Sequence, residues 1–207
     1  NLGCNMRLSS AVALGAFLHF ASLQAGPSQV PSSGEYEQSL AYSMHVVRSY
    51  EFGGLIQTHD GAQWLVHPND RSTVIKWKMD DPITITQNST LFSCCPQYQY
   101  RFLNARDYSE VRVNVHLAPK YDGERTYWIC KIDKEKGTLV LKDRSFWKVH
   151  PSDLPIFENW LVHDTVIIGT NYSSCSSESH ILINVCYDPT GMLPSSSMVR
   201  VNQMGKN

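Results

Sequence analysis

The chain has 207 residues, of which 42% are hydrophobic and 18% are charged, and its formal net charge is −1 at pH 7. These proportions are typical of a globular protein of one or two domains and exclude an intrinsically disordered chain. A net charge this close to zero excludes a strong general attraction to nucleic acid or to anionic lipid. The most cationic stretch, 120–148, also contains five acidic residues, so we expect a solvated surface and no nucleic-acid partner.

The beginning of the chain has the pattern of a secretory signal. Met6 is the first methionine, and it is followed by Arg7 and by an apolar stretch over residues 11–21. A positive charge before an apolar stretch too short to span a bilayer is typical of a signal peptide. We therefore expect a signal-peptide region over 1–25 with Met6 as the start, then a flexible leader over 26–40 rich in serine, proline and glycine. This predicts a periplasmic or secreted protein that is not an integral membrane protein; the alternative is a buried N-terminal helix.

Cysteine usage would follow from export. Beyond residue 26 the cysteines are Cys94, Cys95, Cys130, Cys175 and Cys186. An oxidising compartment favours disulfides, and a bridge between Cys175 and Cys186 would contribute about 3 kcal/mol by closing a short loop. The odd number predicts one free thiol or an oligomer linked through it, and the alternative is that all five stay reduced.

A seven-residue sequence occurs twice in the chain. "WLVHPND" begins at Trp64 and "WKVHPSD" begins at Trp147, 83 positions later. The same offset aligns ten pairs: Asp60/Asp143, Trp64/Trp147, Val66/Val149, His67/His150, Pro68/Pro151, Asp70/Asp153, Trp77/Trp160, Asp81/Asp164, Ile85/Ile168 and Asn88/Asn171. Four of the five tryptophans thus form matched pairs, which indicates tandem copies of one folding unit. We expect repeat 1 over 41–118, a linker over 119–125, repeat 2 over 126–203 and a tail over 204–207.

Each repeat is predicted to be rich in short strands. In repeat 1 we expect strands at 43–49, 55–58, 63–67, 83–86, 100–103 and 111–115, with a helical turn through 73–77. In repeat 2 we expect strands at 126–133, 138–142, 146–150, 165–169, 181–185 and 198–202, with a short helix over 152–160. This predicts a mainly β protein with two tandem small β-barrel or sandwich units of SH3-like or OB-like size, each with one short helical turn. The paired tryptophans are then most simply hydrophobic core.

The H-P-x-D element of each repeat has a structural and a functional interpretation. Structurally, proline ends a strand, Asp70 or Asp153 caps the helical turn, and His67 or His150 lies near the solvent. Functionally, a histidine and an aspartate three residues apart suit metal binding or acid–base chemistry. No further ligands occur at fixed spacing and no familiar catalytic motif is present, so we predict no metal, no cofactor and no catalytic residue.

The contact between the repeats is the best candidate for a binding site. Ile167 is apolar where its counterpart Thr84 is polar, which predicts that the outer face of repeat 2 is covered by repeat 1. We expect a groove there, rimmed by His67 and His150, that holds a peptide or a glycan. The sequence therefore predicts an exported binding or structural module, and the alternative is a hydrolase or metal-dependent enzyme that uses the two H-P-x-D elements.

Two N-x-S/T sequons begin at equivalent positions of the repeats, Asn88 and Asn171. Such sequons accept glycans in a eukaryotic secretory pathway. The alternative is that each asparagine only ends the preceding strand.

The repeated pattern also resembles a known group of proteins. "DGAQWLVHPND" and "DRSFWKVHPSD", each followed by a tryptophan, an aspartate and a β-rich run ending in I-x-x-N, are similar to uncharacterised exported repeat proteins of chlamydia-type intracellular bacteria. Arg144 stands where that pattern has glycine. The resemblance implies export and a β-rich repeat, and it implies no catalytic activity.

Overall fold

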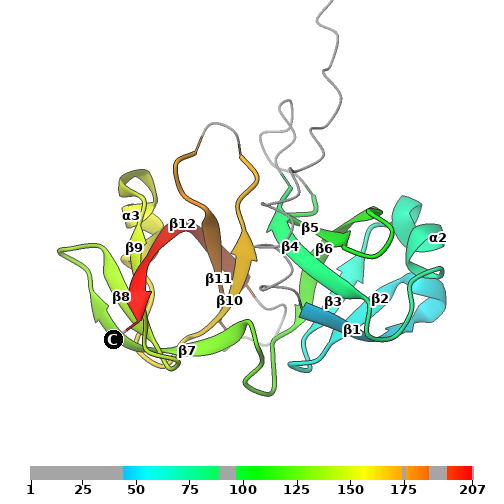
Figure 1. Cartoon of the computed structure of the whole chain (residues 1–207), viewed down its shortest axis with the longest axis horizontal. Helices are drawn as coiled ribbons and strands as arrows, with labels where there is room; N and C mark the ends of the chain where they lie inside the picture. Colours follow the sequence, from blue (N-terminus) through cyan, green and yellow to red (C-terminus); the bar gives the residue numbers. More distant parts are fainter. Residues whose placement is uncertain (1–43, 89–96, 174–175, 187–194, 207) are drawn as a thin grey trace, which may run out of the picture. The chain divides into compact units, whose positions relative to one another are not determined.

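The computed structural model describes residues 44–88, 97–173, 176–186 and 195–206, all within one compact unit, Ser32–Asn207. These residues form two closed antiparallel barrels of six strands each (Figure 1). The prediction of a mainly β protein with two tandem barrel units is therefore confirmed. The expected signal region and leader lie outside the described residues. None of the described residues forms a helix that is long and apolar enough to cross a bilayer.

Barrel 1 follows the order expected for repeat 1. Its strands are β1 (Met44–Tyr50), β2 (Leu55–Thr58), β3 (Gln63–Val66), β4 (Pro82–Gln87), β5 (Tyr100–Asn104) and β6 (Glu110–Leu117). They close in the order β1-β2-β3-β6-β5-β4. A short 3-10 turn, η1 (Glu51–Gly53), joins β1 to β2. A second 3-10 turn, η2 (Pro68–Asp70), follows β3 and leads into α2 (Arg71–Val74), so the helical turn begins earlier than predicted.

Barrel 2 repeats this connectivity strand for strand. Its elements are β7 (Thr126–Asp133), β8 (Thr138–Leu141), β9 (Ser145–Val149), η3 (Pro151–Asp153), α3 (Leu154–Phe157), β10 (Thr165–Thr170), β11 (His180–Cys186) and β12 (Ser195–Lys206). They close in the order β10-β11-β12-β9-β8-β7. The predicted tail over 204–207 is wrong for residues 204–206, because β12 continues through them and pairs Lys206 with Ser145.

The paired tryptophans are core residues, as predicted. Trp64 and Trp147 are 0% and 1% exposed, because strand alternation points both into the barrel interiors. Four indole N–H groups each donate to a hydroxyl: Trp64 to Thr58 (3.3 Å), Trp77 to Ser109 (2.7 Å), Trp147 to Ser145 (2.7 Å) and Trp160 to Ser197 (2.8 Å). Each buried indole therefore packs as a hydrophobe without leaving a donor unsatisfied.

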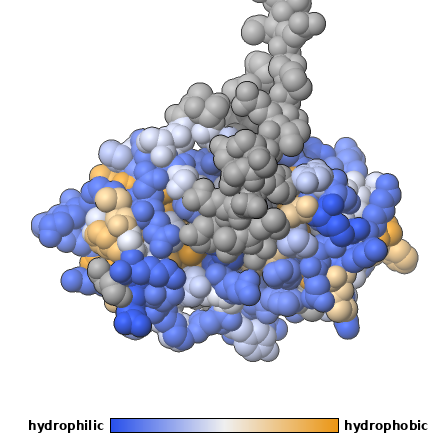
Figure 2. Space-filling model, in the orientation of Figure 1, coloured by the Kyte–Doolittle hydropathy of each residue, from blue (hydrophilic) through white to orange (hydrophobic). Residues whose placement is uncertain are grey.

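The outer face of barrel 2 is covered, which confirms the expectation drawn from Ile167. Strand alternation points Val166, Ile168 and Leu182 into barrel 2, where they join its core. The alternate residues of β10 and β11 are buried in the cluster that contains the core of barrel 1: Ile167, Ile181, Ile183 and Val185. β4 and β10 lie against each other. The face drawn in Figure 2 is mostly hydrophilic with small separate apolar patches, as expected when the apolar strand faces are buried.

Gly169 of β10 lies close to the backbone of β4 in barrel 1. A Cβ atom there would lie 2.7 Å from the carbonyl oxygen of Ile85 and 2.8 Å from the Ile181 side chain. We expect Gly169→Ala to lower the free energy of unfolding by about 1–3 kcal/mol, because a backbone carbonyl cannot rotate away. Denaturant unfolding measures this, and Thr86→Ala at the partly exposed counterpart position in barrel 1 is the control. Equal stability of both variants and the wild type would contradict the described contact.

Candidate functional site

The histidine of each H-P-x-D element caps the turn that follows it. The Nδ1 atoms of His67 and His150 accept hydrogen bonds from the backbone N–H groups of Asn69 and Ser152, each at 3.2 Å. The prediction that the aspartates cap the helical turns is wrong, since neither makes a side-chain cap hydrogen bond. The histidine ring supplies the acceptor instead.

Each aspartate binds an arginine of the last strand of its barrel. Asp153 accepts from the Nε, Nη2 and backbone N of Arg200 at 2.9, 2.7 and 2.8 Å. Asp70 accepts from the same three groups of Arg112, each at 2.9 Å. Such a bidentate pair with an added backbone bond fixes both distance and orientation. The element thus fastens the turn after the third strand to the sixth strand of each barrel.

The arginines also set the charge state of these carboxyl groups. The hydrogen bonds from Arg112 lower the pKa of Asp70 below its usual value. Burial acts to raise the pKa of Asp153, but the hydrogen bonds from Arg200 outweigh it and the net pKa is lowered. Both carboxylates are therefore ionised at neutral pH, as a structural ion pair requires.

The four predicted site residues are held pairwise and not as one cluster. Within the described residues, no hydrogen bond or ion pair joins His67 or Asp70 to His150 or Asp153. Nor does the described part of the chain place three or more His, Cys, Asp or Glu side chains where they could hold a metal ion. The structure brings each histidine to its own aspartate within its own barrel, so these residues fit a repeated structural lock.

The two sequon asparagines mark equivalent positions in the barrels. Asn88 follows β4 and its amide donates to the carbonyl oxygen of Tyr98 at 2.7 Å; Asn171 follows β10 and its amide donates to that of Glu178 at 2.8 Å. Each asparagine thus directly follows the end of a strand, as expected, and whether it also carries a glycan stays a prediction. Tyr98 and Glu178, whose carbonyl oxygens accept these two equivalent bonds, therefore occupy equivalent positions in the two barrels.

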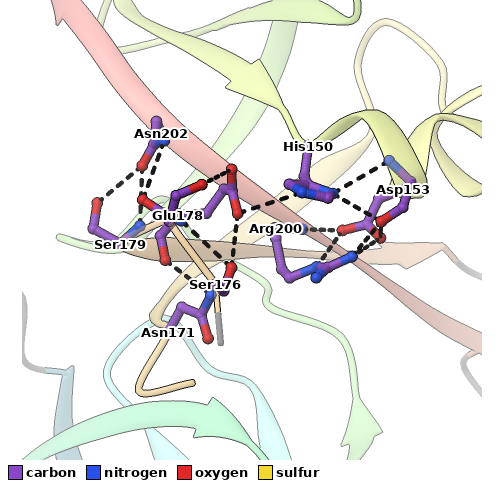
Figure 3. Close-up of polar contacts among 10 residues, drawn as sticks. His150, Asp153, Asn171, Ser176, Glu178, Ser179, Arg200 and Asn202 are labelled. Atoms are coloured by element: carbon purple, nitrogen blue, oxygen red, sulfur yellow. Dashed lines mark hydrogen bonds and ion pairs between the residues drawn. The ribbon is translucent and has the colours of Figure 1, made fainter. Parts of the chain in front are cut away.

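Around the histidines the two barrels differ. The ring of His67 packs edge-on against Tyr98, with centroids 4.9 Å apart. In barrel 2, Nε2 of His150 lies 3.8 Å from Oε2 of Glu178, as Figure 3 shows. In addition, the Ser152 hydroxyl lies 2.8 Å from Nδ1 of His150, at the position that asparagine occupies in barrel 1. His150 was a candidate from the repeated motif, but its acidic neighbour Glu178 was not predicted.

Glu178 is a buried carboxylate. Its residue is 7% exposed, and its oxygens accept from the hydroxyls of Ser176 and Ser177 at 2.7 and 2.9 Å. Burial acts to raise the pKa of Glu178. The hydrogen bonds from the two hydroxyls and from its own backbone, together with His150, lower it by more, so the net pKa lies below its usual value. Barrel 2 therefore keeps a carboxylate beside His150 at the position where barrel 1 has Tyr98 beside His67.

The fifth tryptophan lies in a surface pocket at the linker. Trp128, on the outer face of β7, is 40% exposed, and Tyr121 of the linker is 68% exposed. The pocket has a volume of about 340 Å³ and is lined by Pro119, Lys120, Tyr121, Asp122, Trp128 and Thr165. Nζ of Lys142 lies 3.8 Å from the centre of the Trp128 ring and also forms an ion pair with Asp122. This pocket was not predicted from the repeat, although Trp128 is the tryptophan without a partner in it.

Buried Asp60 of barrel 1 holds the linker that forms this pocket. Its carbonyl oxygen accepts from the backbone N–H groups of Lys120 and Tyr121 at 2.8 and 3.0 Å. Its carboxylate accepts from the Thr126 hydroxyl at the start of β7, at 2.5 Å. The pocket is therefore formed by backbone that is already fixed on both sides.

The pocket presents hydrogen-bond donors. Among the described residues no acceptor binds the indole N–H of Trp128 or the hydroxyl of Tyr121, whereas the other four indoles all donate to hydroxyls. Lys120 adds an ammonium group and Thr165 a hydroxyl. Aromatic faces beside available donors suit a ligand with an apolar body and carbonyl acceptors.

Only some of the cysteines named in the disulfide prediction are among the described residues. Cys94, Cys95 and Cys175 lie outside the described residues, so the candidate bridge from Cys175 to Cys186 stays a prediction. Cys130, on the outer face of β7, is exposed and forms no disulfide. Comparison of the whole chain with family models, with curated proteins and with solved structures found no match.

His180 makes barrel 2 sensitive to acid. It packs edge-on against Trp147, with centroids 5.3 Å apart, where barrel 1 has Tyr100 against Trp64. Burial, assisted by the charge of Arg125, lowers the pKa of His180 to about 4. The neutral ring therefore contributes stability in full above pH 6.5, and this contribution is lost as the pH falls from about 6.5 toward 4.

We expect His180→Tyr to remove this acid sensitivity. Between pH 7 and pH 4 the wild type should lose about 2 kcal/mol more unfolding free energy than the variant, because the ring is packed but not wholly enclosed. Denaturant titrations at both pH values measure the difference, and all other titrating groups cancel between the two proteins. Parallel pH profiles would contradict the assignment.

Proposed function

We propose that the chain is an exported binding module whose pocket beside Trp128 holds a proline-rich peptide segment in the polyproline II conformation. The observation that carries this proposal is that two exposed aromatic residues, Trp128 and Tyr121, line one pocket and that their polar groups have no acceptor among the described residues. The two barrels have equivalent tryptophan-containing cores and equivalent aspartate–arginine ion pairs. The pocket is built from the linker and from the tryptophan that the repeat does not match.

The donors of the pocket favour a peptide of this kind. Proline has no N–H, so a polyproline II segment presents carbonyl acceptors and apolar rings but few donors. Grooves lined by aromatic side chains bind such segments because little conformational entropy is lost on binding. The indole N–H of Trp128 and the hydroxyl of Tyr121 are the matching donors, and the exposed ring of Tyr121 is the matching apolar surface.

A glycan fits this pocket less well. Sugar rings stack on an open aromatic face, but Lys142 lies over the Trp128 ring and is held there by Asp122. Stacking would need to displace a cation–π contact worth about 0.5–1 kcal/mol at an exposed site, and to separate an ion pair. Glycan binding is therefore an outcome that counts against the peptide proposal.

Titration of the full chain with a ten-residue oligoproline, followed by calorimetry, tests the proposal. We expect saturable binding that Trp128→Ala weakens at least about tenfold, the effect of losing a central aromatic contact. Phe52→Ala is the matched control, because Phe52 is an exposed aromatic residue of barrel 1 away from the pocket residues. Binding of a chito-oligosaccharide in place of the peptide, or peptide binding that Trp128→Ala leaves unchanged, would overturn it.

The export part of the proposal is supported by the pattern of residues 6–25. Fusion of residues 6–40 to a reporter that is active only outside the bacterial cytoplasm tests it. We expect reporter activity that is lost when a charged residue interrupts the apolar stretch over 11–21. A reporter that stays inactive with the natural sequence would refute export.

A further inference from the structure

Ser152, His150 and Glu178 lie in the order of a nucleophile, a base and an acid. The Ser152 hydroxyl is exposed and lies 2.8 Å from Nδ1 of His150, closer than its 3.2 Å contact with Oδ1 of Asp153. Nε2 of His150 lies 3.8 Å from Glu178. This last distance is longer than a hydrogen bond, but such contacts are often loose in a site without substrate.

The hydrogen bonds define which imidazole nitrogen carries the proton. A backbone N–H can only donate, and that of Ser152 points at Nδ1 of His150 at 3.2 Å. Nδ1 is therefore an acceptor in the neutral ring, and the proton lies on Nε2, on the side of Glu178. The same Nδ1 can accept the hydroxyl proton of Ser152, and the Glu178 carboxylate then stabilises the imidazolium that results.

Barrel 1 shows that this arrangement is not needed for folding. It has the same histidine cap and the same aspartate–arginine pair, but Asn69 stands where barrel 2 has Ser152 and Tyr98 where it has Glu178. The fold therefore requires neither a serine nor an acid at these positions. Their joint presence in barrel 2 calls for another explanation.

Arg200 adds a positive charge at the serine. Its Nη2 donates to the Ser152 hydroxyl oxygen. The same guanidinium group also binds Asp153 (Figure 3). A guanidinium group there favours negative charge on the serine oxygen and on a carbonyl oxygen that approaches it. The side chains of His150 and Arg200 are 30% and 28% exposed, so a small substrate can reach the group from the solvent.

We propose that barrel 2 carries an acyl-transfer site for small esters, with Ser152 as nucleophile and His150 as general base. The Ser152 oxygen bonds to the ester carbonyl carbon while its proton moves to Nδ1 of His150. The carbon–oxygen bond to the alcohol then breaks, and the same proton passes to the leaving oxygen. Water repeats these steps on the acyl-serine and releases the carboxylic acid. This activity goes beyond peptide binding and does not depend on it.

Labelling of the full chain with a fluorophosphonate tests the site without knowledge of the natural ester. The Ser152 oxygen bonds to phosphorus, fluoride leaves, and peptide mass spectrometry locates the adduct. We expect an adduct on Ser152 that is absent in Ser152→Ala. The labelling rate should fall about 100-fold in His150→Asn and about tenfold in Glu178→Gln, because proton transfer by a placed base contributes 10²–10⁴-fold.

Asn69→Ser in barrel 1 is the matched control. It places a serine beside His67 with Tyr98 in place of the acid, and we expect it to stay unlabelled. Circular dichroism verifies that each variant is folded. An unlabelled wild type, an adduct at another residue, or His150→Asn that labels at the wild-type rate would overturn the proposal. If Asn69→Ser were labelled at residue 69 as fast as the wild type is labelled at Ser152, the proposed role of Glu178 would be wrong.

Discussion

Replacement of Trp147 by alanine is expected to lower the free energy of unfolding by about 3–5 kcal/mol, the usual cost of removing a large buried aromatic side chain. Trp147 is 1% exposed, packs against His180 and donates its indole N–H to Ser145. Its removal leaves a cavity in barrel 2 and takes one hydrogen-bond donor away from the Ser145 hydroxyl. Guanidinium unfolding measures the loss.

Trp64→Ala is the matched variant in barrel 1. Trp64 is 0% exposed, and its ring contacts Phe102 with centroids 4.8 Å apart. A loss of similar size is expected, because the two tryptophans occupy equivalent interiors. A loss below about 1 kcal/mol at either position would be typical of an exposed aromatic residue and would refute its core role.

The second large effect is expected for Asp153→Asn, which should lower the free energy of unfolding by about 2–3 kcal/mol. Asp153 is 8% exposed and satisfies two side-chain nitrogens and the backbone N–H of Arg200. Asparagine cannot replace a carboxylate that accepts on both oxygens, so Arg200 keeps a partly buried charge without a counterion. The partial exposure of Arg200 keeps the effect below that of a fully buried pair.

Asp133→Asn provides the control for this effect. The Asp133 carboxylate also pairs with a cation, Lys136, but Asp133 is partly exposed and Lys136 is exposed, so this ion pair contributes little. No measurable change is expected there. If the two variants were equally stable in denaturant, Asp153 would not lock the turn after β9 to β12.

The pH dependence separates the histidine from the aspartates. The ionised Asp70 and Asp153 stabilise the fold at every pH above their usual pKa, and this contribution is lost only as the pH falls through their lowered pKa values. The contribution of neutral His180 is already lost between about 6.5 and 4. As the pH is lowered, acid unfolding of the wild type should therefore begin at a higher pH than that of His180→Tyr. Both should be complete over the same range of pH.

The duplicated sequence was enough to predict two small, mainly β units, but it left barrel and sandwich open. Trp64 and Val66 alternate with solvent-side residues, and Trp147 and Val149 do the same 83 positions later, which fixes strand type and inner face together. The apolar Ile167 opposite polar Thr84 predicted the covered face correctly. The end of β12 was missed, because Met204 and Gly205 are a poor strand sequence that is held in place by pairing with β9.

The candidate site could be predicted only in part, because its partners come from distant strands. His150 and Asp153 were found from their repetition, but Arg200 meets Asp153 across 47 positions through the register of β12. Glu178 reaches His150 because Asn171 anchors the segment after β10. Neither contact follows from local spacing. Asp153 binds Arg200, and His150 caps the turn as had been predicted for Asp153.

Each functional proposal depends on residues at which the two copies differ, although the proposed base His150 has a counterpart in His67. Trp128 has no tryptophan counterpart, and Ser152 and Glu178 replace Asn69 and Tyr98. Where the copies agree, their shared side chains have a sufficient structural role as core, cap or ion pair. Positions at which the two copies differ are thus the first candidates for function, because the shared positions already have a structural role.

The indole signals of a ¹H–¹⁵N spectrum test the central claim most directly. The chain has five tryptophans, four of which donate to internal hydroxyls while Trp128 lies in the pocket. Addition of oligoproline should shift the Trp128 indole signal, identified by its loss in Trp128→Phe, and leave the other four in place. A Trp128 signal that stays fixed at saturating peptide, or equal shifts of all five, would contradict a binding site built on the unrepeated tryptophan.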